Sequence, residues 1–305
     1  MSEATQPSTT IVIVTYNSMS LIDDTLRTAQ RCHDAGLAKC VVVDNESKDG
    51  TADHIASAFP FVNLVRSGGN LGFGRGNNRG FEEVDTKYTL FLNPDARCEP
   101  DALKTMIDFM EAHPDAGVCG PAGKLTEGGL HAAGRAPTPG MVLRDALGRT
   151  RPSDLAAPIE PGSAPKQVEW IPGAALMFSS QVFLALGGFD PRFFLYWEET
   201  DLLLRVREYG AQVWAVGTAV IDHVGGASAV RENRNMYRGC LAEHYFQSRF
   251  YYLSKHYGRR GAYAVEVGET ALFALRALPQ RLRGRTRSML EERMTGPFFE
   301  MPRLP

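Results

Sequence analysis

The first 120 residues alternate short apolar, β-branched runs with segments of helical periodicity, and this pattern strongly constrains the fold. The strand-like runs are residues 10–15, 40–43, 62–65, 88–92 and 116–119. Continuous apolar strands separated by helices indicate a parallel sheet that is covered on both faces. We therefore predict an α/β chain with a Rossmann-like, mostly parallel central sheet and helices on both faces.

The composition supports a globular protein, because 44% of the 305 residues are hydrophobic. A formal net charge of −2 argues against nucleic acid as a partner, which would need a basic surface. The five cysteines form no C-x-x-C pair, so neither a disulfide framework nor a thiolate metal site is indicated. The N-terminus shows no signal-peptide pattern, so we predict a cytoplasmic protein.

The second half of the chain is less regular. Residues 132–166 are rich in Pro, Gly and Ala and predict a long loop or a hinge. Further strands are expected at residues 173–179, 212–216 and 219–221. From about residue 231 the chain becomes aromatic and basic with helical periodicity, which predicts a C-terminal helical extension.

Polar residues follow three of the predicted strands. They are Tyr16-Asn17, Asp44-Asn45 and Asn93-Pro94-Asp95. Because ligands bind at the carboxyl ends of parallel strands, we expect these residues to share one edge of the sheet. Asp44 could accept hydrogen bonds from a ribose or a base, or it could simply begin a turn.

Asp95 and His223 are the candidate metal ligands. Pro94 ends its strand and presents the Asp95 carboxylate, and Mg²⁺ or Mn²⁺ bound to a diphosphate needs only one or two such ligands. The alternative is that Asp95 caps the next helix. His223 also follows an apolar strand, where it is either a metal ligand or a turn residue with satisfied hydrogen bonds.

The glycine-rich run GGNLGFGRGNNRG, residues 68–80, misses the G-x-G-x-x-G spacing, which argues against a dinucleotide site. Two interpretations remain open. The run could bring its backbone close to a sugar and a phosphate, with Arg75 as a phosphate partner, or it could be a mobile surface loop. A helix is expected to follow at about residues 77–83.

Three acids, Glu198, Glu199 and Asp201, begin a predicted helix. The helix dipole favours acids at this position, so some of them are expected for structural reasons alone. Crowded carboxylates also raise one another's pKa, so one of them could accept a proton from a hydroxyl. Arg205, one turn beyond Asp201, predicts an ion pair and a structural role for that acid.

In this order, the segments TYN, VVDNESKDGT, GGNLGFGRGNNRG, FLNPD, PGAALMF, GGFDPRFFLYWEETDLLLR and DH resemble a family 2 glycosyltransferase, most closely a bacterial rhamnosyltransferase-like branch. The resemblance covers about residues 9–228. It implies a GT-A fold and inverting sugar transfer from a nucleotide-diphosphate donor, with Mg²⁺ or Mn²⁺ as cofactor. It also implies a catalytic domain over residues 1–228, followed by the helical, basic and aromatic extension 229–305. The donor half would be residues 9–120 and the acceptor half 166–228.

Site residues follow from the resemblance by position. Those implied to bind the donor are Thr15, Tyr16, Asn17, Asp44, Asn45, Gly72, Arg75, Asn77, Asn93 and Asp95. Those implied to bind the acceptor are Trp170, Gly173, Tyr196 and Trp197. Asp95 and His223 would bind the metal, and Glu199, beside Glu198, would be the general base. Two positions depart from the family pattern, since Asn93 replaces an acid and Glu199 replaces an Asp.

The branch resemblance implies dTDP-rhamnose as donor and a glycan or polyprenyl-linked saccharide as acceptor, in cell-surface polysaccharide synthesis. A nucleotidyltransferase, a glycoside hydrolase and a non-catalytic nucleotide-sugar-binding protein are the alternatives. A nucleotidyltransferase should carry a glycine-rich basic loop after its first strand, and TYNSMS is not one. Arginines 281, 283, 285 and 287 could contact the cytoplasmic face of the inner membrane. Packing of this segment on the core or on a second subunit, as in a homodimer, is the alternative.

Overall fold

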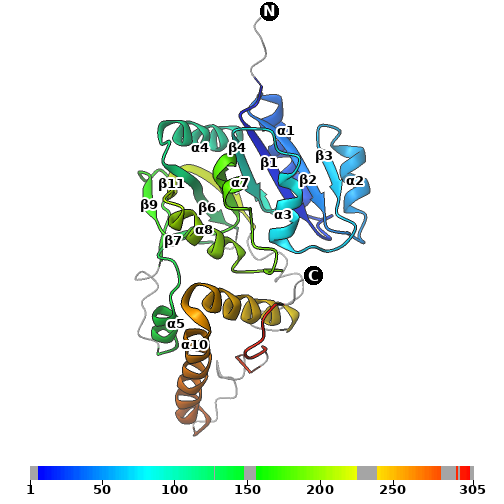
Figure 1. The fold of residues 1–305 in the computed structure, drawn as a ribbon. Helices are drawn as coiled ribbons and strands as arrows, with labels where there is room; N and C mark the ends of the chain where they lie inside the picture. Colours follow the sequence, from blue (N-terminus) through cyan, green and yellow to red (C-terminus); the bar gives the residue numbers. More distant parts are fainter. Residues whose placement is uncertain are drawn as a thin grey trace, which may run out of the picture.

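The protein is described here from a computed structural model that covers residues 6–126, 128–147, 156–224, 239–282, 293–294 and 296–302. The side chains of residues 239–241 and 276–282 are outside this description. A mixed sheet of nine strands forms the upper part of the molecule in Figure 1, and a helical region lies below it. The fold class expected from the sequence is therefore confirmed at the level of sheet and layers.

Four parallel strands form one half of the sheet, in the order β3-β2-β1-β4. They are β1 (Thr9–Thr15), β2 (Ala38–Asp44), β3 (Asn63–Arg66) and β4 (Tyr88–Leu92). Every residue of β1 and β4 is buried, as expected for continuous apolar strands that are covered on both faces. The polar residues that follow β1, β2 and β4 therefore stand at the same edge of the sheet.

The other half of the sheet is mixed. Its strands are β10 (Ala175–Ser179), β6 (Ala116–Leu125), β11 (Gln212–His223), β5 (Ala96–Arg97) and β9 (Lys166–Val168). Strand β10 runs antiparallel to both β4 and β6, whereas β11 is parallel to β6. The two strands predicted at residues 212–216 and 219–221 are one strand, β11, whose register shifts between Val216 and Val220.

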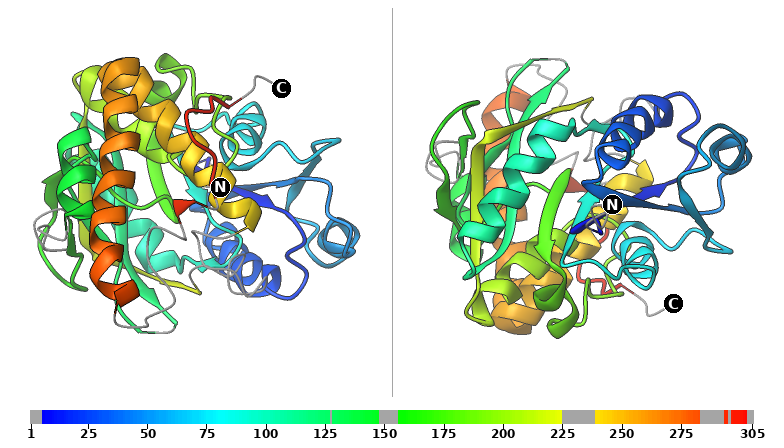
Figure 2. Two further views of the ribbon diagram at one scale, coloured as in Figure 1. Left: turned by 90° about the horizontal axis from the view of Figure 1, so that it is seen from below. Right: turned by 90° about the horizontal axis from the view of Figure 1, so that it is seen from above.

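Helices cover both faces of the sheet, as the two views of Figure 2 show. The bounds are α1 (Ile22–Asp34), α2 (Thr51–Ala58), α3 (Phe73–Phe81), α4 (Pro100–Ala112), α7 (Ser180–Ala185) and α8 (Glu198–Glu208). On one face, α1 and α4 bury residues such as Leu26 and Leu103. On the other face, α7 and α8 bury residues such as Phe183 and Leu202, and α3 lies on β1.

Residues 73–80 of the glycine-rich run belong to helix α3, so the interpretation of the run as a mobile loop is wrong for these residues. The helix also begins at Phe73, earlier than expected. A Cβ atom on Gly76 would lie 2.7 Å from Val14 Cγ1, and one on Gly80 would lie 2.5 Å from Val12 Cγ1. Two glycines one turn apart therefore allow the helix to lie directly on β1.

The segment predicted as a long loop contains several regular elements in its described residues. They are β7 (Ala132–Gly134), α5 (Pro139–Ala146), β8 (Ala156–Pro158) and β9. Thr138 caps α5, because its hydroxyl accepts a hydrogen bond from the Met141 N–H. Strands β7 and β8 pair with each other outside the main sheet. The expectation of an irregular loop is therefore wrong for the described part of this segment.

The C-terminal region is a long helix, α10 (Gly239–Leu282), with a kink at Gly258. Gly258 has φ 81° and ψ 151°, which interrupts the helical hydrogen bonds and turns the second half of α10 downward in Figure 1. The first half packs its aromatic residues, including Tyr251 and Tyr252, against Phe193 and Trp197. No helix in the described residues is long and apolar enough to cross a membrane.

Candidate active site

Three buried polar atoms without partners mark the ends of β1 and β2. Thr15 and Asp44 are opposite each other in the parallel register, and the Asn45 N–H donates to the Thr15 carbonyl at 2.8 Å. Thr15 Oγ1, Asp44 Oδ1 and Asn45 Oδ1 are buried and have no hydrogen-bond partner among the described residues. Buried polar groups are normally satisfied, so this group indicates a site for a polar ligand.

The loop after β1 is held by the loop after β2. The Asn17 N–H donates to Ser47 Oγ at 2.9 Å, and the Lys48 N–H donates to Asn17 Oδ1 at 2.7 Å. Asp44 Oδ2 accepts from the Ser47 N–H at 3.1 Å, which leaves only Oδ1 for a ligand. Tyr16 is 48% exposed, so its ring is accessible at this edge of the sheet.

Gly72 joins this edge to the segment that precedes α8. Its carbonyl accepts from Asn45 Nδ2 at 2.9 Å, and a Cβ atom on it would lie 2.1 Å from the Phe194 carbonyl oxygen. Asn77 is buried and donates to the Phe73 carbonyl of its own helix at 3.1 Å. Arg75 instead lines a hollow of about 770 Å³ between α3 and α10, together with residues such as His244.

The structure brings Asp95 and His223 together, although 128 residues separate them. Strand β5 pairs with the end of β11, with Ala96 opposite His223, and His223 Nε2 lies 3.1 Å from Asp95 Oδ1. Asn93 forms the turn that places Asp95, because its carbonyl accepts from the Ala96 N–H at 3.1 Å. Its own N–H donates to the Ala174 carbonyl at 2.9 Å.

The Asp95–His223 pair offers one carboxylate and one imidazole to a divalent cation. No cluster of three or more His, Cys, Asp or Glu side chains able to hold a metal occurs in the described residues. Mg²⁺ and Mn²⁺ bound to a diphosphate often take only one or two protein ligands, and phosphate and water complete the shell. One carboxylate and one imidazole therefore fit a cation that arrives with its nucleotide, and the nitrogen ligand suits Mn²⁺ better than Mg²⁺.

His131, which no sequence pattern indicates, lies behind His223. His131 Nε2 is 2.9 Å from His223 Nδ1, and His131 is buried. Burial lowers the pKa of His131 to about 4, with the neighbouring His223 adding to the effect, so His131 is neutral at pH 7. Gly123 makes room for this ring, because a Cβ atom there would lie 2.1 Å from His131 Nδ1.

Helix α8 begins at the paired acids, as predicted. The two preceding residues, Tyr196 and Trp197, have φ angles of 68° and 69°, which is a strained conformation for side chains of this size. Glu198 is buried, and its Oε2 has no partner in the described part of the chain. Burial raises the pKa of both carboxyls, and the charge of Glu199 raises that of Glu198 further.

Glu199 is held from two sides. Trp170 Nε1 donates to Thr200 Oγ1 at 3.0 Å, and this hydroxyl donates to Glu199 Oε1 at 3.3 Å. A Cβ atom on Gly173 would lie only 3.4 Å from Glu199 Cγ. Gly173 precedes Ala174, whose carbonyl binds Asn93, so one short segment lies beside the Glu199 side chain and is bonded to the turn that presents Asp95.

Asp201 is structural, and its predicted ion pair with Arg205 is confirmed. Arg205 Nε donates to its carboxylate at 2.8 Å, and Lys255 Nζ and His256 Nε2 of α10 lie 2.6 and 2.7 Å from its other oxygen. Asp201 is fully buried. It therefore fastens α8, which carries the candidate base, to the C-terminal helix.

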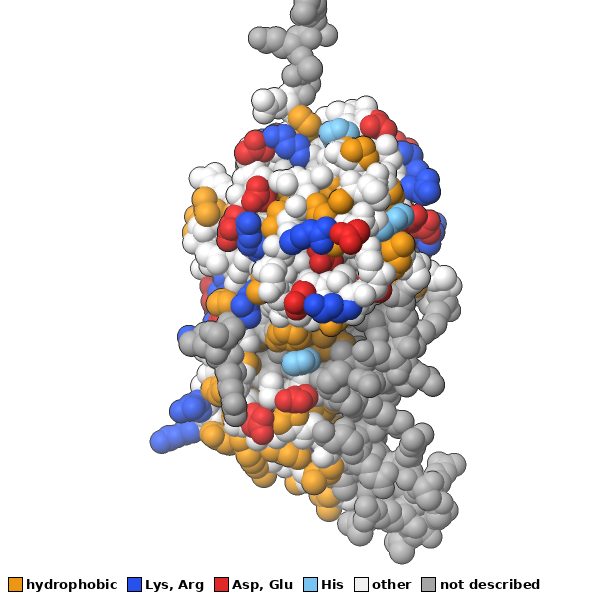
Figure 3. All heavy atoms as spheres, turned by 90° about the vertical axis from the view of Figure 1, so that its right-hand side faces the viewer, with side chains coloured by type: hydrophobic (Ala, Val, Ile, Leu, Met, Phe, Trp, Pro, Cys, Tyr) orange, Lys and Arg blue, Asp and Glu red, His pale blue; other side chains and the backbone are white. Residues whose placement is uncertain are grey.

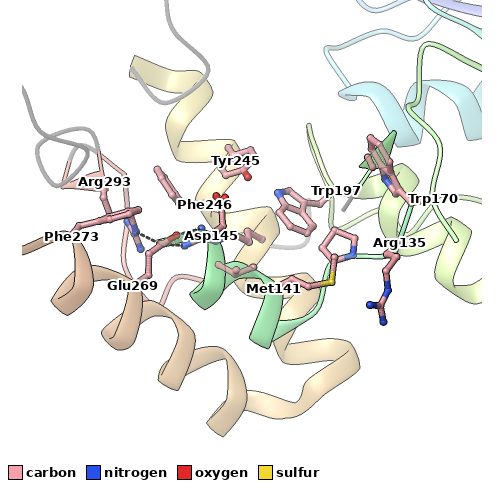
Figure 4. A pocket seen from close by; sticks show the side chains of 14 residues that line it. Arg135, Met141, Asp145, Trp170, Trp197, Tyr245, Phe246, Glu269, Phe273 and Arg293 are labelled. Carbon is pink, nitrogen blue, oxygen red and sulfur yellow. Dashed lines mark hydrogen bonds and ion pairs between the residues drawn. The ribbon is translucent and has the colours of Figure 1, made fainter. Parts of the chain in front are cut away.

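A cavity of about 250 Å³ lies between α5, α10 and the two tryptophans of the candidate acceptor site. Figure 4 shows Trp170 and Trp197 at one end, and Phe273 and Arg293 at the other. Most of the lining is aromatic or aliphatic, and Trp197 Nε1 has no hydrogen-bond partner among the described residues. Trp170 bonds to Thr200 and Trp197 precedes Glu198, so the cavity lies next to the paired acids.

A sheet with polar strand ends, a carboxylate–histidine pair and a buried glutamate is the arrangement expected of an enzyme that handles an activated sugar. Residues 10–138 match the family described as Glycosyl transferase family 2. The chain carries a glycosyltransferase domain of this family.

Three relatives support this assignment. The chain is 26% identical over 238 residues to the N-acetylglucosaminyl-diphospho-decaprenol L-rhamnosyltransferase of Mycobacterium tuberculosis, which covers 72% of this chain and 75% of the relative. It is 28% identical over 203 residues to rhamnosyltransferase WbbL of Escherichia coli, covering 62% of this chain and 72% of WbbL. It is also 28% identical over 203 residues to the low-salt glycan biosynthesis hexosyltransferase Agl10 of Haloferax volcanii, covering 65% of this chain and 61% of Agl10.

Solved structures agree with the predicted GT-A fold. Mannosyltransferase PcManGT from Pyrobaculum calidifontis, solved with GDP-Man and Mn²⁺, aligns with a TM-score of 0.54 at 16% identity. The alignment covers 96% of this chain and 86% of that protein. S. aureus TarS 1-349 aligns with a TM-score of 0.51 at 14% identity, covering 92% of this chain and 83% of TarS 1-349. The fold expected from the resemblance is confirmed.

Proposed function

We propose that this protein is an inverting glycosyltransferase that moves a sugar from a nucleotide-diphosphate donor to a hydroxyl of a glycan or a polyprenyl-linked saccharide. One observation carries the proposal. The Gly173-Ala174 segment lies beside Glu199, because a Cβ atom added to Gly173 would be 3.4 Å from Glu199 Cγ, and the Ala174 carbonyl binds the N–H of Asn93, two residues before Asp95. A candidate base and a candidate leaving-group site are thus built around the same short piece of backbone.

The donor nucleoside would occupy the edge at Thr15, Asp44 and Asn45, whose free oxygens match ribose hydroxyls and the polar edge of a base. Tyr16, Asn17 and Gly72 would complete this part of the site. Asn77 and Arg75 stay predictions from the resemblance: the Asn77 side chain is bonded within α3, and Arg75 lines a separate hollow. The names of the rhamnosyltransferase relatives support rhamnose as the transferred sugar, and we propose dTDP-rhamnose as its donor.

The diphosphate would be held near Asp95 and His223, with Asn93 as a neighbouring polar group. A Mg²⁺ or Mn²⁺ ion bound by this pair would offset the negative charge that grows on the departing diphosphate. The protein's part is to fix the carboxylate and the imidazole side by side, through the β5–β11 pairing and the contact with His131.

Glu199 would act as the general base. As the acceptor oxygen attacks the anomeric carbon, Glu199 accepts the hydroxyl proton while the bond from that carbon to the diphosphate oxygen breaks. Attack from the face opposite the leaving group inverts the anomeric centre. The raised pKa of Glu199 suits this role, because it brings the carboxylate closer to the basicity that proton transfer at neutral pH requires. Glu198 would lie beside the base as the second carboxylate of the pair.

The acceptor would enter through the cavity at Trp170 and Trp197, with Tyr196 and Gly173 near its inner end. Aromatic walls with a free indole N–H suit a molecule that has both apolar and hydroxyl-bearing faces. The M. tuberculosis relative is named for a decaprenol-linked acceptor, which supports a lipid-linked saccharide here. We place the reaction in cell-surface polysaccharide synthesis, at the cytoplasmic face of the membrane. The domain boundary proposed at residue 228 lies outside the described residues.

A thermal-shift panel of nucleotide sugars, with and without Mn²⁺, tests the proposal. We expect one donor to raise the melting temperature only when the metal is present, and Asp95→Ala to remove this shift. Asp101→Ala, which changes an exposed carboxylate on α4, should leave it intact. Equal stabilisation without metal would contradict the assignment of Asp95. Donor binding without release of nucleoside diphosphate in the presence of acceptor would indicate a binding protein instead.

A further inference from the structure

The second half of α10 exposes only basic and apolar residues over residues 259–275. They are Arg259, Arg260, Tyr263, Ala264, Val267, Ala271 and Leu275. Tyr263, Val267, Ala271 and Leu275 recur every fourth residue and so form one stripe along the helix. Val267 is 59% exposed and Leu275 is 63% exposed, so the stripe presents large apolar side chains to solvent along one line of the helix.

The acids of the same segment point inward. Glu266 and Glu269 are buried, and both pair with Arg249 at 2.7 and 2.6 Å. Glu266 also pairs with Arg293, which is itself buried. Among the exposed residues of 259–275, the outer side of this half-helix therefore carries two arginines and no acid, while the two glutamates of the segment are paired inside.

The neighbouring helix does not cancel this charge. Helix α5 packs on α10 where Leu143 lies against Gly268. Its exposed residues Arg144 and Asp145 carry opposite charges, so together they add no net charge. The formal net charge of the whole chain is −2, so attraction to an anionic surface must come from a local patch and not from the molecule as a whole. Figure 3 shows hydrophobic side chains gathered over the lower part of the molecule, below the sheet.

We propose that this outer side of α10 lies on an anionic lipid surface, with Val267 and Leu275 in the interface and Arg259 and Arg260 at the headgroups. A helix of this kind binds by shallow insertion of an apolar stripe together with electrostatic attraction to anionic lipids. A stripe with three large apolar residues is small for a stable protein–protein interface, which buries about 800 Å² on each partner. The inference extends the proposed function, because a polyprenyl-linked acceptor resides in such a surface.

Flotation of the full-length protein with lipid vesicles tests the inference. We expect binding to vesicles that contain phosphatidylglycerol and much weaker binding to pure phosphatidylcholine. Because each basic residue near an anionic surface contributes roughly fivefold in partitioning, Arg259→Gln with Arg260→Gln should weaken binding about 25-fold. Val267→Glu with Leu275→Glu should weaken it by at least about tenfold.

Matched controls separate this surface from general effects of charge. Lys124→Gln with Lys166→Gln removes two exposed cations elsewhere, and Leu184→Glu alters an apolar residue that is 68% exposed on α7. Both controls should bind vesicles like the wild type. If the glutamate pair unfolds the protein, Val267→Ser with Leu275→Ser replaces it, with the melting temperature as the check on folding.

Two results would overturn the inference. One is equal vesicle binding by the wild type and both α10 double variants. The other is a change of oligomeric mass in the Val267/Leu275 variant with vesicle binding unchanged, since the stripe would then contact a second copy. Sugar transfer to a water-soluble acceptor should be the same in all variants. Loss of transfer in the wild type would contradict the proposed function, whereas loss of flotation alone would contradict the membrane inference.

Discussion

Glu199 stands in the first turn of α8, where the Thr200 hydroxyl and Gly173 fix its side chain. Glu199→Gln keeps the shape of the side chain but removes the ability to accept a proton. We expect kcat to fall by about 10²–10⁴ while the donor still binds, as measured by release of nucleoside diphosphate and by donor-induced thermal shift. Glu208→Gln, at the exposed end of the same helix, is the control. Unchanged kcat in Glu199→Gln would exclude Glu199 as the base.

The pH dependence of transfer should report the same group. Burial raises the pKa of Glu199, and only its ionised form can act as a base. The rate should therefore fall as the pH drops through this raised pKa, at a pH above about 4.3, the ordinary value for glutamate. Thr200→Val removes a hydrogen bond that lowers this pKa, so it should move the acid limb of kcat/KM to still higher pH. A limb at the ordinary value in both proteins would contradict the assignment.

His131 should influence the metal site without binding the metal. His131→Phe leaves His223 Nδ1 without its partner, and loss of such a supporting contact typically weakens metal binding by about 10–100-fold. His131→Gln, which can still offer a hydrogen bond, should recover part of the affinity. Mn²⁺ titration followed by electron paramagnetic resonance measures both. Wild-type affinity in His131→Phe would show that His223 needs no support.

At the scale of elements, a Gly-to-Ala substitution, which adds one methyl group, tests how closely α3 packs on β1. Gly80→Ala places a Cβ atom 2.5 Å from Val12 Cγ1, and overpacking of this kind typically costs about 1–3 kcal/mol. Urea unfolding should show this loss in the free energy of unfolding. Gly69→Ala is the matched control, because a Cβ atom there meets nothing within 4 Å. An equal effect of the two substitutions would argue against close packing at Gly80.

The elements that could be predicted are those whose signal is local. Strands β1, β2 and β4 are apolar runs that are buried on both sides, so composition alone indicates them. Helix α3 was placed too late because glycine has low helix propensity, and its start depends on contact with the sheet. Strands of two or three residues, such as β5 and β7, have no periodicity that could be detected.

The same limit applies to the candidate site. Asp95 and Glu199 stand at the ends of elements that the pattern predicts, so their positions could be anticipated. His131 lies 92 residues from His223, and their contact depends on the backbone hydrogen bond from the His131 N–H to the Gly123 carbonyl in β6. No spacing in the sequence encodes this contact. The side chains of the arginines at 281, 283, 285 and 287, which were predicted to meet a membrane, lie outside the described residues.

At the scale of the whole molecule, Asp201 connects the sheet region to α10. Asp201→Asn removes the charge that Lys255 and His256 share, and breaking a buried ion pair from one side typically costs about 3–5 kcal/mol. Chemical denaturation should show this loss. Asp108→Asn, in an exposed pair with Lys104, should cost less than about 1 kcal/mol. Similar losses in the two variants would mean that the buried pair contributes little.

The pKa of Asp201 gives this connection a pH dependence. Burial alone would raise the pKa, but the hydrogen bond from His256 and the charges of Arg205 and Lys255 lower it overall. The stabilisation is therefore present at neutral pH and is lost as the pH falls through the lowered pKa.

The ion pairs of Asp201 with α10 limit how far the chain can be shortened. Cutting the chain before α10 would take Lys255 and His256 away together and leave the Asp201 carboxylate with Arg205 as its remaining ion-pair partner among the described residues. Replacing α10 with the C-terminal helix of a related protein would also remove these ion pairs, unless the residues at positions 201, 255 and 256 are kept together. Helix α10 thus helps to hold α8, which carries the candidate base, in place, and the two helices should be engineered together.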